Sequence, residues 1–249
     1  MSNRIFVAGA SGAIGRRLCL LLIRDGWQVT GTTRSPEKAE DLRALGVEPA
    51  IVDVFDADQL QRVVVQAHAE IVIHQLTDLM AGMATGNIAE ARRKNACLRE
   101  VGTRNLVAAA IAGGARRMIA QSIAFAYAPG ILPYREDAPL NVDVNDETSA
   151  LSARAVASLE QQVLGGPWVG IVLRYGRLYG PGTGVEAPPS GSPVHVDAAA
   201  NAARQAITHG NHGLYNIAEA DGTVSNANAL QELKWRPDFR IAHKGPIVD

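Results

Sequence analysis

The segment VAGASGAIGRRL, residues 7–18, places Gly9, Gly12 and Gly15 directly after an apolar run and at the start of a helix-like stretch. In such a segment the first glycine permits a tight turn, the second lets a phosphate approach the backbone, and the third lets the helix pack closely on the strand. Backbone N–H groups at the start of the helix would then face the phosphates. The spacing and its strand-to-helix context predict a dinucleotide-binding loop, and the alternative is a glycine-rich turn without a ligand.

Strand-like and helix-like stretches alternate around this segment. Strands are predicted at residues 4–8, 27–33, 47–52, 70–76, 116–121 and 169–174, and helices at 13–25, 36–45, 56–67, 88–112 and 149–164. Continuous apolar strands that alternate with helices are typical of a parallel sheet covered on both faces. The sequence therefore predicts an α/β fold, a doubly wound parallel sheet of the Rossmann type, over residues 1–175.

The pattern changes after residue 175. Residues 179–193 are rich in glycine and proline, and a helix near 196–209, a short strand at 213–217 and a final helix near 225–234 follow. Clusters of glycine and proline predict irregular loops. We expect residues 176–249 to form a small C-terminal region on the substrate side that does not fold as an independent domain.

The composition narrows the classes of partner. The 249 residues carry a net charge of −1, which gives no indication of a nucleic-acid or membrane partner. Cys19 and Cys97 lie in helix-like stretches without a CxxC pair and are expected to be buried and reduced. No apolar run is long enough to span a membrane, and the N-terminus leads directly into a strand, so a cytoplasmic protein is expected. The HGNH segment at 209–212 lacks further ligands at metal-site spacing, so no metal is expected.

The end of the second predicted strand indicates which dinucleotide is bound. An acidic residue about 20 positions after the glycines typically binds the ribose hydroxyls of NAD. Here the chain reads GTTRSPEKA, with Arg34 and Ser35 where that carboxylate would stand. A guanidinium pairs with phosphate, so this pair favours the 2′-phosphate of NADP over NAD. The alternative for Arg34 is a solvated loop residue.

These motifs resemble the short-chain dehydrogenase/reductase superfamily, in its extended NAD-dependent epimerase/dehydratase branch. The resemblance rests on GASGAIG (9–15), VDVFD (52–56), VIHQL (72–76), VGTRNLVAAAIAGGARRMIAQS (101–122), VLRYGRLYGPG (172–182), VHVDAAANA (194–202) and GLYNIAE (213–219). It implies that Asp53 and Val54 contact adenine and that Leu76 borders the adenine ribose. It also implies a homodimer through the helices at 88–112 and 149–164. The further cofactor contacts expected are Ser11, Ala13, Ile14, Thr77, Gln121, Tyr175 and Leu178.

The resemblance further implies a catalytic set, which this chain carries only in part. The family uses a Ser or Thr at the end of the fifth strand and a Tyr-xxx-Lys pair on the next helix, where the lysine charge lowers the tyrosine pKa. Ser122 matches the first position, but Ser152 and Val156 occupy the positions of the pair. Tyr127 is the second catalytic candidate. The alternatives are a pocket hydroxyl without a catalytic role for Ser122, and packing or a loop hydrogen bond for Tyr127.

Two further departures bear on function. Arg99 stands where the family often carries an asparagine, three residues before the GT pair. Only twelve residues separate Gly182 from His195, too few for a helical section that encloses a large ligand. We expect an atypical NAD(P)-dependent oxidoreductase or epimerase-like enzyme that acts on a small carbonyl or hydroxyl substrate. The alternative is a non-catalytic NAD(P)-binding sensor or regulatory protein. His195 and Asp197 are expected to have a structural role.

Overall fold

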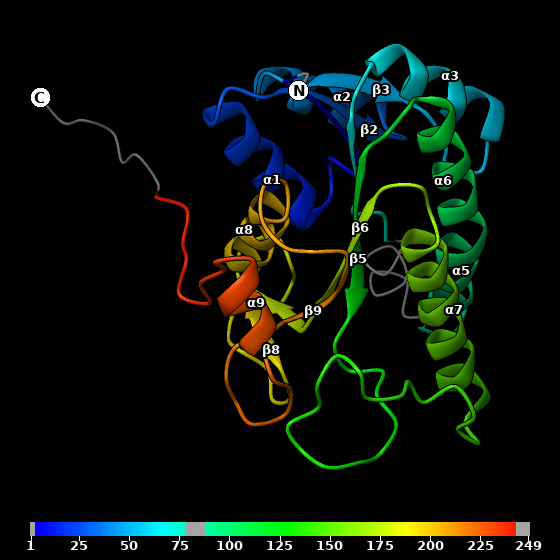
Figure 1. Ribbon diagram of the computed structural model, residues 1–249. Helices are drawn as coiled ribbons and strands as arrows, with labels where there is room; N and C mark the ends of the chain where they lie inside the picture. Colours follow the sequence, from blue (N-terminus) through cyan, green and yellow to red (C-terminus); the bar gives the residue numbers. More distant parts are fainter. Residues whose placement is uncertain (1–2, 78–87, 243–249) are drawn as a thin grey trace, which may run out of the picture.

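The computed structural model describes residues 3–77 and 88–242 (Figure 1). Its elements in chain order are β1 (Arg4–Ala8), α1 (Ala13–Arg24), β2 (Gln28–Thr33), α2 (Pro36–Ala44), β3 (Glu48–Ile51), α3 (Ala57–Ala67), β4 (Ile71–His74), α5 (Ile88–Cys97), the π-helical turn η1 (Leu98–Gly102), α6 (Thr103–Ala112), β5 (Arg117–Ile123), α7 (Glu147–Leu164), β6 (Val169–Tyr175), β7 (Arg177–Tyr179), β8 (Pro193–His195), α8 (Val196–Gln205), β9 (Gly213–Ile217) and α9 (Ala227–Glu232).

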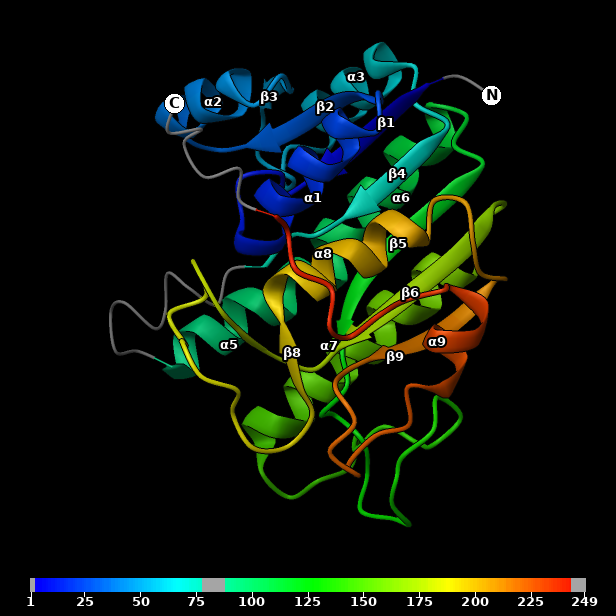
Figure 2. The ribbon, with the colours of Figure 1, turned by 90° about the vertical axis from the view of Figure 1, so that its left-hand side faces the viewer.

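Seven of the strands form one parallel sheet in the order β3-β2-β1-β4-β5-β6-β9. The chain runs outward from β1 to β3 and then returns to the other side of β1, so the order reverses between β1 and β4. In open α/β sheets, ligands bind at such a reversal, beyond the carboxyl ends of the strands. Figure 2 shows this sheet with α1 and α8 lying across one face. The predicted doubly wound fold is confirmed.

Alternating side chains of the strands build two cores. In β1, Ile5 and Val7 belong to one buried cluster, and Phe6 and Ala8 belong to the other. This period of two is the geometry of a strand buried on both faces. Figure 1 places α1, α8 and α9 on one side of the sheet and α3, α5, α6 and α7 on the other.

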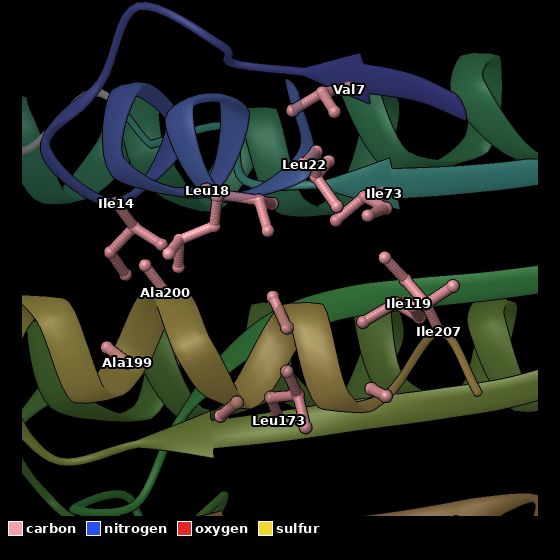
Figure 3. Close-up of a cluster of buried hydrophobic side chains, with 14 of the residues drawn as sticks. Val7, Ile14, Leu18, Leu22, Ile73, Ile119, Leu173, Ala199, Ala200 and Ile207 are labelled. Atoms are coloured by element: carbon pink, nitrogen blue, oxygen red, sulfur yellow. The ribbon is translucent and has the colours of Figure 1, made fainter. Parts of the chain in front are cut away.

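Small residues let α8 approach α1 closely. The alanine-rich sequence of α8 places Ala199 and Ala200, both fully buried, opposite Ile14 and Leu18 of α1 (Figure 3). Alanine adds little bulk, so the larger side chains of α1 fill the space between the helices. The contact fixes the helix that begins at the glycine loop against the body of the protein.

The structure differs from the sequence-based prediction in three local features. The helix predicted at 88–112 contains the π-helical turn η1, and the side chain of Cys97, expected to be buried, is exposed. The stretch after residue 175 holds two short strands, β7 and β8, that pair only with each other. Such three-residue strands have no alternating pattern to detect. The boundary at residue 176 stays a prediction, and β9 from that region is the seventh strand of the main sheet.

Candidate cofactor and substrate site

The three glycines of the β1–α1 loop occupy three different environments. Gly9 has a φ of +87°, and a Cβ there would lie 2.7 Å from the carbonyl oxygen of Gln75 at the end of β4. A Cβ at Gly15 would lie 2.2 Å from the carbonyl oxygen of Gly9. At Gly12 the nearest atom would be 3.4 Å away, in ordinary contact with the same oxygen. Gly9 and Gly15 are thus required by the loop itself, whereas Gly12 faces open space.

This open space lies at the start of α1. Gly12 is the N-cap residue, with extended backbone, and its carbonyl accepts the first helical hydrogen bond from Arg16. The amides of the following turn, Ala13 to Gly15, have no partner within the helix. Free N–H groups at a helix N-terminus next to an open glycine fit the pyrophosphate of a dinucleotide. The side chain of Ile14 points toward α8, so only its backbone would serve this purpose.

The end of β2 is attached to this loop by hydrogen bonds. The amide of Gly9 donates to Oγ1 of Thr32 at 2.9 Å, and Oγ of Ser11 donates to Oγ1 of Thr33 at 3.2 Å. The amide of Ser35 donates to the same Thr33 oxygen, and the Ser35 hydroxyl caps α2 by accepting from the amide of Lys38. These bonds hold the exposed Arg34 and its neighbour Ser35 beside the glycine loop.

The other predicted cofactor residues lie along the same carboxyl edge. Asp53 is exposed after β3 and accepts from the amide of Phe55, whereas Val54 is buried. Nε2 of Gln121, at the end of β5, donates to the carbonyl of Leu76 at 2.8 Å. Thr77 lies one residue further along and is exposed. Cofactor contact by these residues stays a prediction, but the fold brings the strand ends that carry them together.

Tyr175 and Leu178 occupy the β6 end of this edge. The Tyr175 side chain is buried, its hydroxyl accepts a 3.2 Å hydrogen bond from Nε2 of Gln75, and burial raises its pKa above the ordinary range. Leu178 is half-buried in β7. The hydroxyl of Tyr175 is therefore protonated at neutral pH, and it connects the ends of β6 and β4.

Ser122 belongs to a buried network of charged groups. Its hydroxyl, in a residue only 1% exposed, donates to Oε1 of Glu160 on α7 at 2.8 Å. Arg174 of β6 donates to both Glu160 oxygens, at 2.8 and 2.7 Å. Burial alone would lower the pKa of Arg174, but the hydrogen bonds and charge of Glu160 raise it. This pair has the two parallel hydrogen bonds of a strong guanidinium–carboxylate contact.

Tyr127 extends the same network. Its hydroxyl donates to Oδ1 of Asn216 at 2.6 Å and accepts from Nη1 of Arg174 at 2.9 Å. The Arg174 guanidinium also lies 5.0 Å from the centre of the Tyr127 ring, and that ring stacks on Tyr134. Burial raises the pKa of Tyr127, although the charge of Arg174 opposes this. The Tyr127 hydroxyl is therefore protonated, and it both donates and accepts a hydrogen bond within the protein.

No tyrosine–lysine pair stands on α7. The Ser152 hydroxyl donates to the carbonyl of Thr148 within the helix, and Val156 is fully buried. Arg154 is exposed and donates to the carbonyl of Val142. The catalytic roles expected for Ser122 and Tyr127 stay predictions. In this structure both hydroxyls are buried within the protein, so the geometry favours a positioning role.

His195 and Asp197 have structural contacts, as expected. His195 caps α8 by accepting from the amide of Asp197. Asp197 accepts from Nε of Arg17 at 2.7 Å and from the amide of Ile241 at 3.1 Å. Within residues 3–77 and 88–242, no group of three His, Cys, Asp or Glu side chains could hold a metal ion. No helix in these ranges is long and apolar enough to cross a membrane.

The sequence analysis missed Glu160 and Arg174 as partners of the predicted catalytic residues. A charged residue inside the apolar strand segment VGIVLRY was the available signal, because such a charge needs a buried partner. Nothing in the sequence identified Glu160 as that partner. The segment that contains Thr32 and Thr33 was interpreted only through its lack of a carboxylate. In the structure these two threonines attach the glycine loop to β2.

An open glycine loop at the reversal of a seven-stranded parallel sheet defines an NAD(P)-binding Rossmann protein. The chain belongs to the NAD(P)H-binding family, whose model matches residues 9–163. The predicted resemblance is therefore confirmed.

Two relatives are named as reductases. The chain is 40% identical to 3-diazoavenalumate denitrifying reductase from a Streptomyces species over 230 residues, 92% of this chain and 72% of the relative. It is 32% identical to 4-hydroxy-2-methyl-3-oxo-4-farnesyl-3,4-dihydroquinoline-1-oxide ketoreductase of Stigmatella aurantiaca over 139 residues, 55% of this chain and 39% of that one.

Solved structures share the fold at lower identity. UDP-glucose 4-epimerase of Thermotoga maritima, with UDP-glucose, matches at a TM-score of 0.75 and 17% identity, over 95% of this chain and 94% of the epimerase. WbmG of Bordetella bronchiseptica, in complex with NAD and UDP, matches at 0.73 and 15% identity, over 96% and 90% of the two chains.

Proposed function

We propose that this protein is an NAD(P)H-dependent reductase of a small organic substrate and that NADPH is its preferred cofactor. The open position at Gly12, next to the free amides of α1, is the observation that carries the proposal. The relatives named as reductases support the direction of the reaction. Arg34 and Ser35, held beside the loop by the bonds of Thr33, support NADPH over NADH.

The substrate side supports a small ligand. Residues 183–194 contain no helix; the amide of Gly180 donates to the carbonyl of Val185, and the chain then enters β8. A nucleotide sugar needs a larger enclosing section than this segment provides. The site therefore suits a small carbonyl compound or another small hydride acceptor.

The missing tyrosine–lysine pair restricts the chemistry. When bound, NADPH supplies a hydride. Reduction of a simple ketone produces an alkoxide that needs a proton donor, and the hydroxyls of Ser122 and Tyr127 are held inside the protein. An acceptor that is already cationic or conjugated avoids a localised alkoxide; hydride addition to an aromatic diazonium group, for example, yields a neutral diazene. The name of the Streptomyces relative, a diazo-compound reductase, supports this class of acceptor.

The test is NADPH oxidation by the purified protein with three probes: a simple ketone, an α,β-unsaturated ketone and an aromatic diazonium salt. UDP-glucose is incubated separately with the protein and NAD⁺ or NADP⁺, and its conversion to UDP-galactose is assayed directly. The proposal predicts turnover of the conjugated or cationic probes, slow reduction of the simple ketone and no conversion of UDP-glucose. Epimerisation of UDP-glucose would contradict it.

A non-catalytic NAD(P)-binding sensor is the second candidate, and the absent tyrosine–lysine pair favours it. It predicts that NADPH binds but is oxidised by none of the small acceptors. A change in protein–protein association with cofactor occupancy would then support the sensor.

A further inference from the structure

Arg99 is a buried cation that makes no hydrogen bond with the residues that the structure describes. It lies on the π-helical turn η1, its residue is 4% exposed, and its Nε has no acceptor. Its guanidinium donates no hydrogen bond to any residue that the structure describes. Buried guanidinium groups are ordinarily paired, and single π-helical turns frequently occur at functional sites. We therefore expect the Arg99 guanidinium to contact a ligand.

Arg99 is the middle member of an inward-facing polar row. Asn95, Arg99 and Thr103 are spaced four residues apart and are all buried, so they lie on one face of the helix. Oγ1 of Thr77 donates to Oδ1 of Asn95 at 3.2 Å, and Nε2 of His74 lies 3.0 Å from Oγ1 of Thr103. Both neighbours of Arg99 are thus bonded to the carboxyl end of β4, while Arg99 between them is not.

Among the residues that the structure describes, Arg99 shares its nearest buried carboxylate, Glu160, with a second arginine. The described residues buried on this face of the sheet include two arginines, Arg99 and Arg174, and one carboxylate, Glu160. Arg174 already occupies both Glu160 oxygens, and Ser122 donates to one of them. Burial, together with the charge of Arg99, lowers the pKa of His74 to about 4, so that ring is neutral. Burial lowers the pKa of Arg99 to about 10, which leaves it charged at neutral pH.

We propose that Arg99 binds the carboxylate of an anionic substrate at the carboxyl ends of β4 and β5. A substrate carboxylate would supply a counter-charge that no described residue devotes to Arg99 alone, and its two oxygens match the planar fork of the guanidinium. The end of β4 flanks the reversal of the sheet, where ligands of this fold class bind, and β5 lies next to β4. This inference rests on the proposed reductase function, because it names the class of substrate which that site would take.

The experiment compares three carboxylates, pyruvate, benzoate and cinnamate, with their neutral amides. Binding is measured by calorimetry on the full chain saturated with NADP⁺. For at least one pair, the wild type is expected to bind the carboxylate about tenfold more tightly than the amide, the scale of one charge-assisted hydrogen bond. Arg99→Met removes this preference, Arg99→Lys keeps part of it, and the affinity for NADPH stays the same in both.

Thermal unfolding separates this role from a structural one. Arg99→Met removes an unpaired buried charge and is expected to leave Tm unchanged or raised. Arg174→Met, the matched control, breaks a bonded pair and is expected to lower Tm. A lower Tm in Arg99→Met would show that Arg99 is structural, and weaker NADPH binding would show that it serves a cofactor phosphate. Either result overturns the proposal, as does a wild type without preference for any carboxylate. Absence of NADPH binding to the wild type would instead refute the proposed reductase.

Discussion

The two halves of the sheet's carboxyl edge differ in whether their polar groups are open to a ligand or are hydrogen-bonded within the protein. At the β1–β2 end, the glycine loop presents an open position at Gly12 and the first backbone amides of α1, which have no partner within the helix. At the β5–β6 end, Ser122, Tyr127 and Arg174 are joined by hydrogen bonds that run into the protein. Cofactor binding in this fold depends on backbone geometry, and the glycine loop of this chain has that geometry. Proton transfer depends on individual side chains, and the hydroxyls of Ser122 and Tyr127 are hydrogen-bonded within the protein.

Gly12→Val tests the first half and has the largest expected effect. The valine Cβ would make only an ordinary contact with the carbonyl oxygen of Gly9, but it would stand where the pyrophosphate approaches. We expect the fold to be kept and NADPH binding to become undetectable by calorimetry. Gly15→Val is the matched control, because its Cβ would clash with the carbonyl oxygen of Gly9 and destabilise the protein itself. Near-normal affinity in Gly12→Val would show that the loop does not bind the cofactor.

Glu160→Gln tests the second half. Removing the carboxylate leaves the buried Arg174 without its counter-charge, which we expect to cost about 3 kcal/mol of unfolding free energy in urea denaturation. The matched control is Asp41→Asn, where the exposed pair with Arg16 is lost and the cost should stay below about 0.5 kcal/mol. Equal effects of the two substitutions would remove the argument that the network is structural.

Arg34→Ala sharpens the choice of cofactor. If the guanidinium pairs with the 2′-phosphate, NADPH binding should weaken by about 1.5–3 kcal/mol while NADH binding hardly changes. Arg116→Ala is the control, since this exposed arginine lies before β5, at the opposite edge of the sheet. An equal loss for both cofactors, or a wild type that prefers NADH, would refute the assignment of NADPH.

Ser122→Ala has the smallest expected effect. It removes one buried hydrogen bond to Glu160, worth about 1 kcal/mol of stability, and should leave NADPH affinity unchanged. Turnover is then compared with that of the wild type at a temperature where both proteins are folded. A loss of turnover beyond the loss of folded protein would support the catalytic role predicted for Ser122. It would contradict the view that the β5–β6 half of the edge has only a structural role.

The sequence predicted the parts of the site that depend on local geometry. The glycine loop is predicted from seven consecutive residues, because the strand before it and the helix after it determine where each glycine is needed. The network is different: Glu160 lies 38 residues from Ser122 and 14 from Arg174 along the chain. It forms because β5 and β6 pair with Ser122 opposite Arg174, a register that no local pattern specifies. The π-helical turn at Arg99 could not be predicted either, because residues 88–112 have the pattern of one continuous helix.

The most direct test of the account is amide hydrogen exchange of the wild-type protein with and without NADPH. The account predicts that protection on binding is largest at residues 12–15, where the free amides of α1 would meet the pyrophosphate. It predicts little change in the amides of α7 around Glu160, whose neighbours are already bonded within the protein. Protection centred on α7, with residues 12–15 unchanged, would contradict the division of this edge into a cofactor-binding half and a structural half.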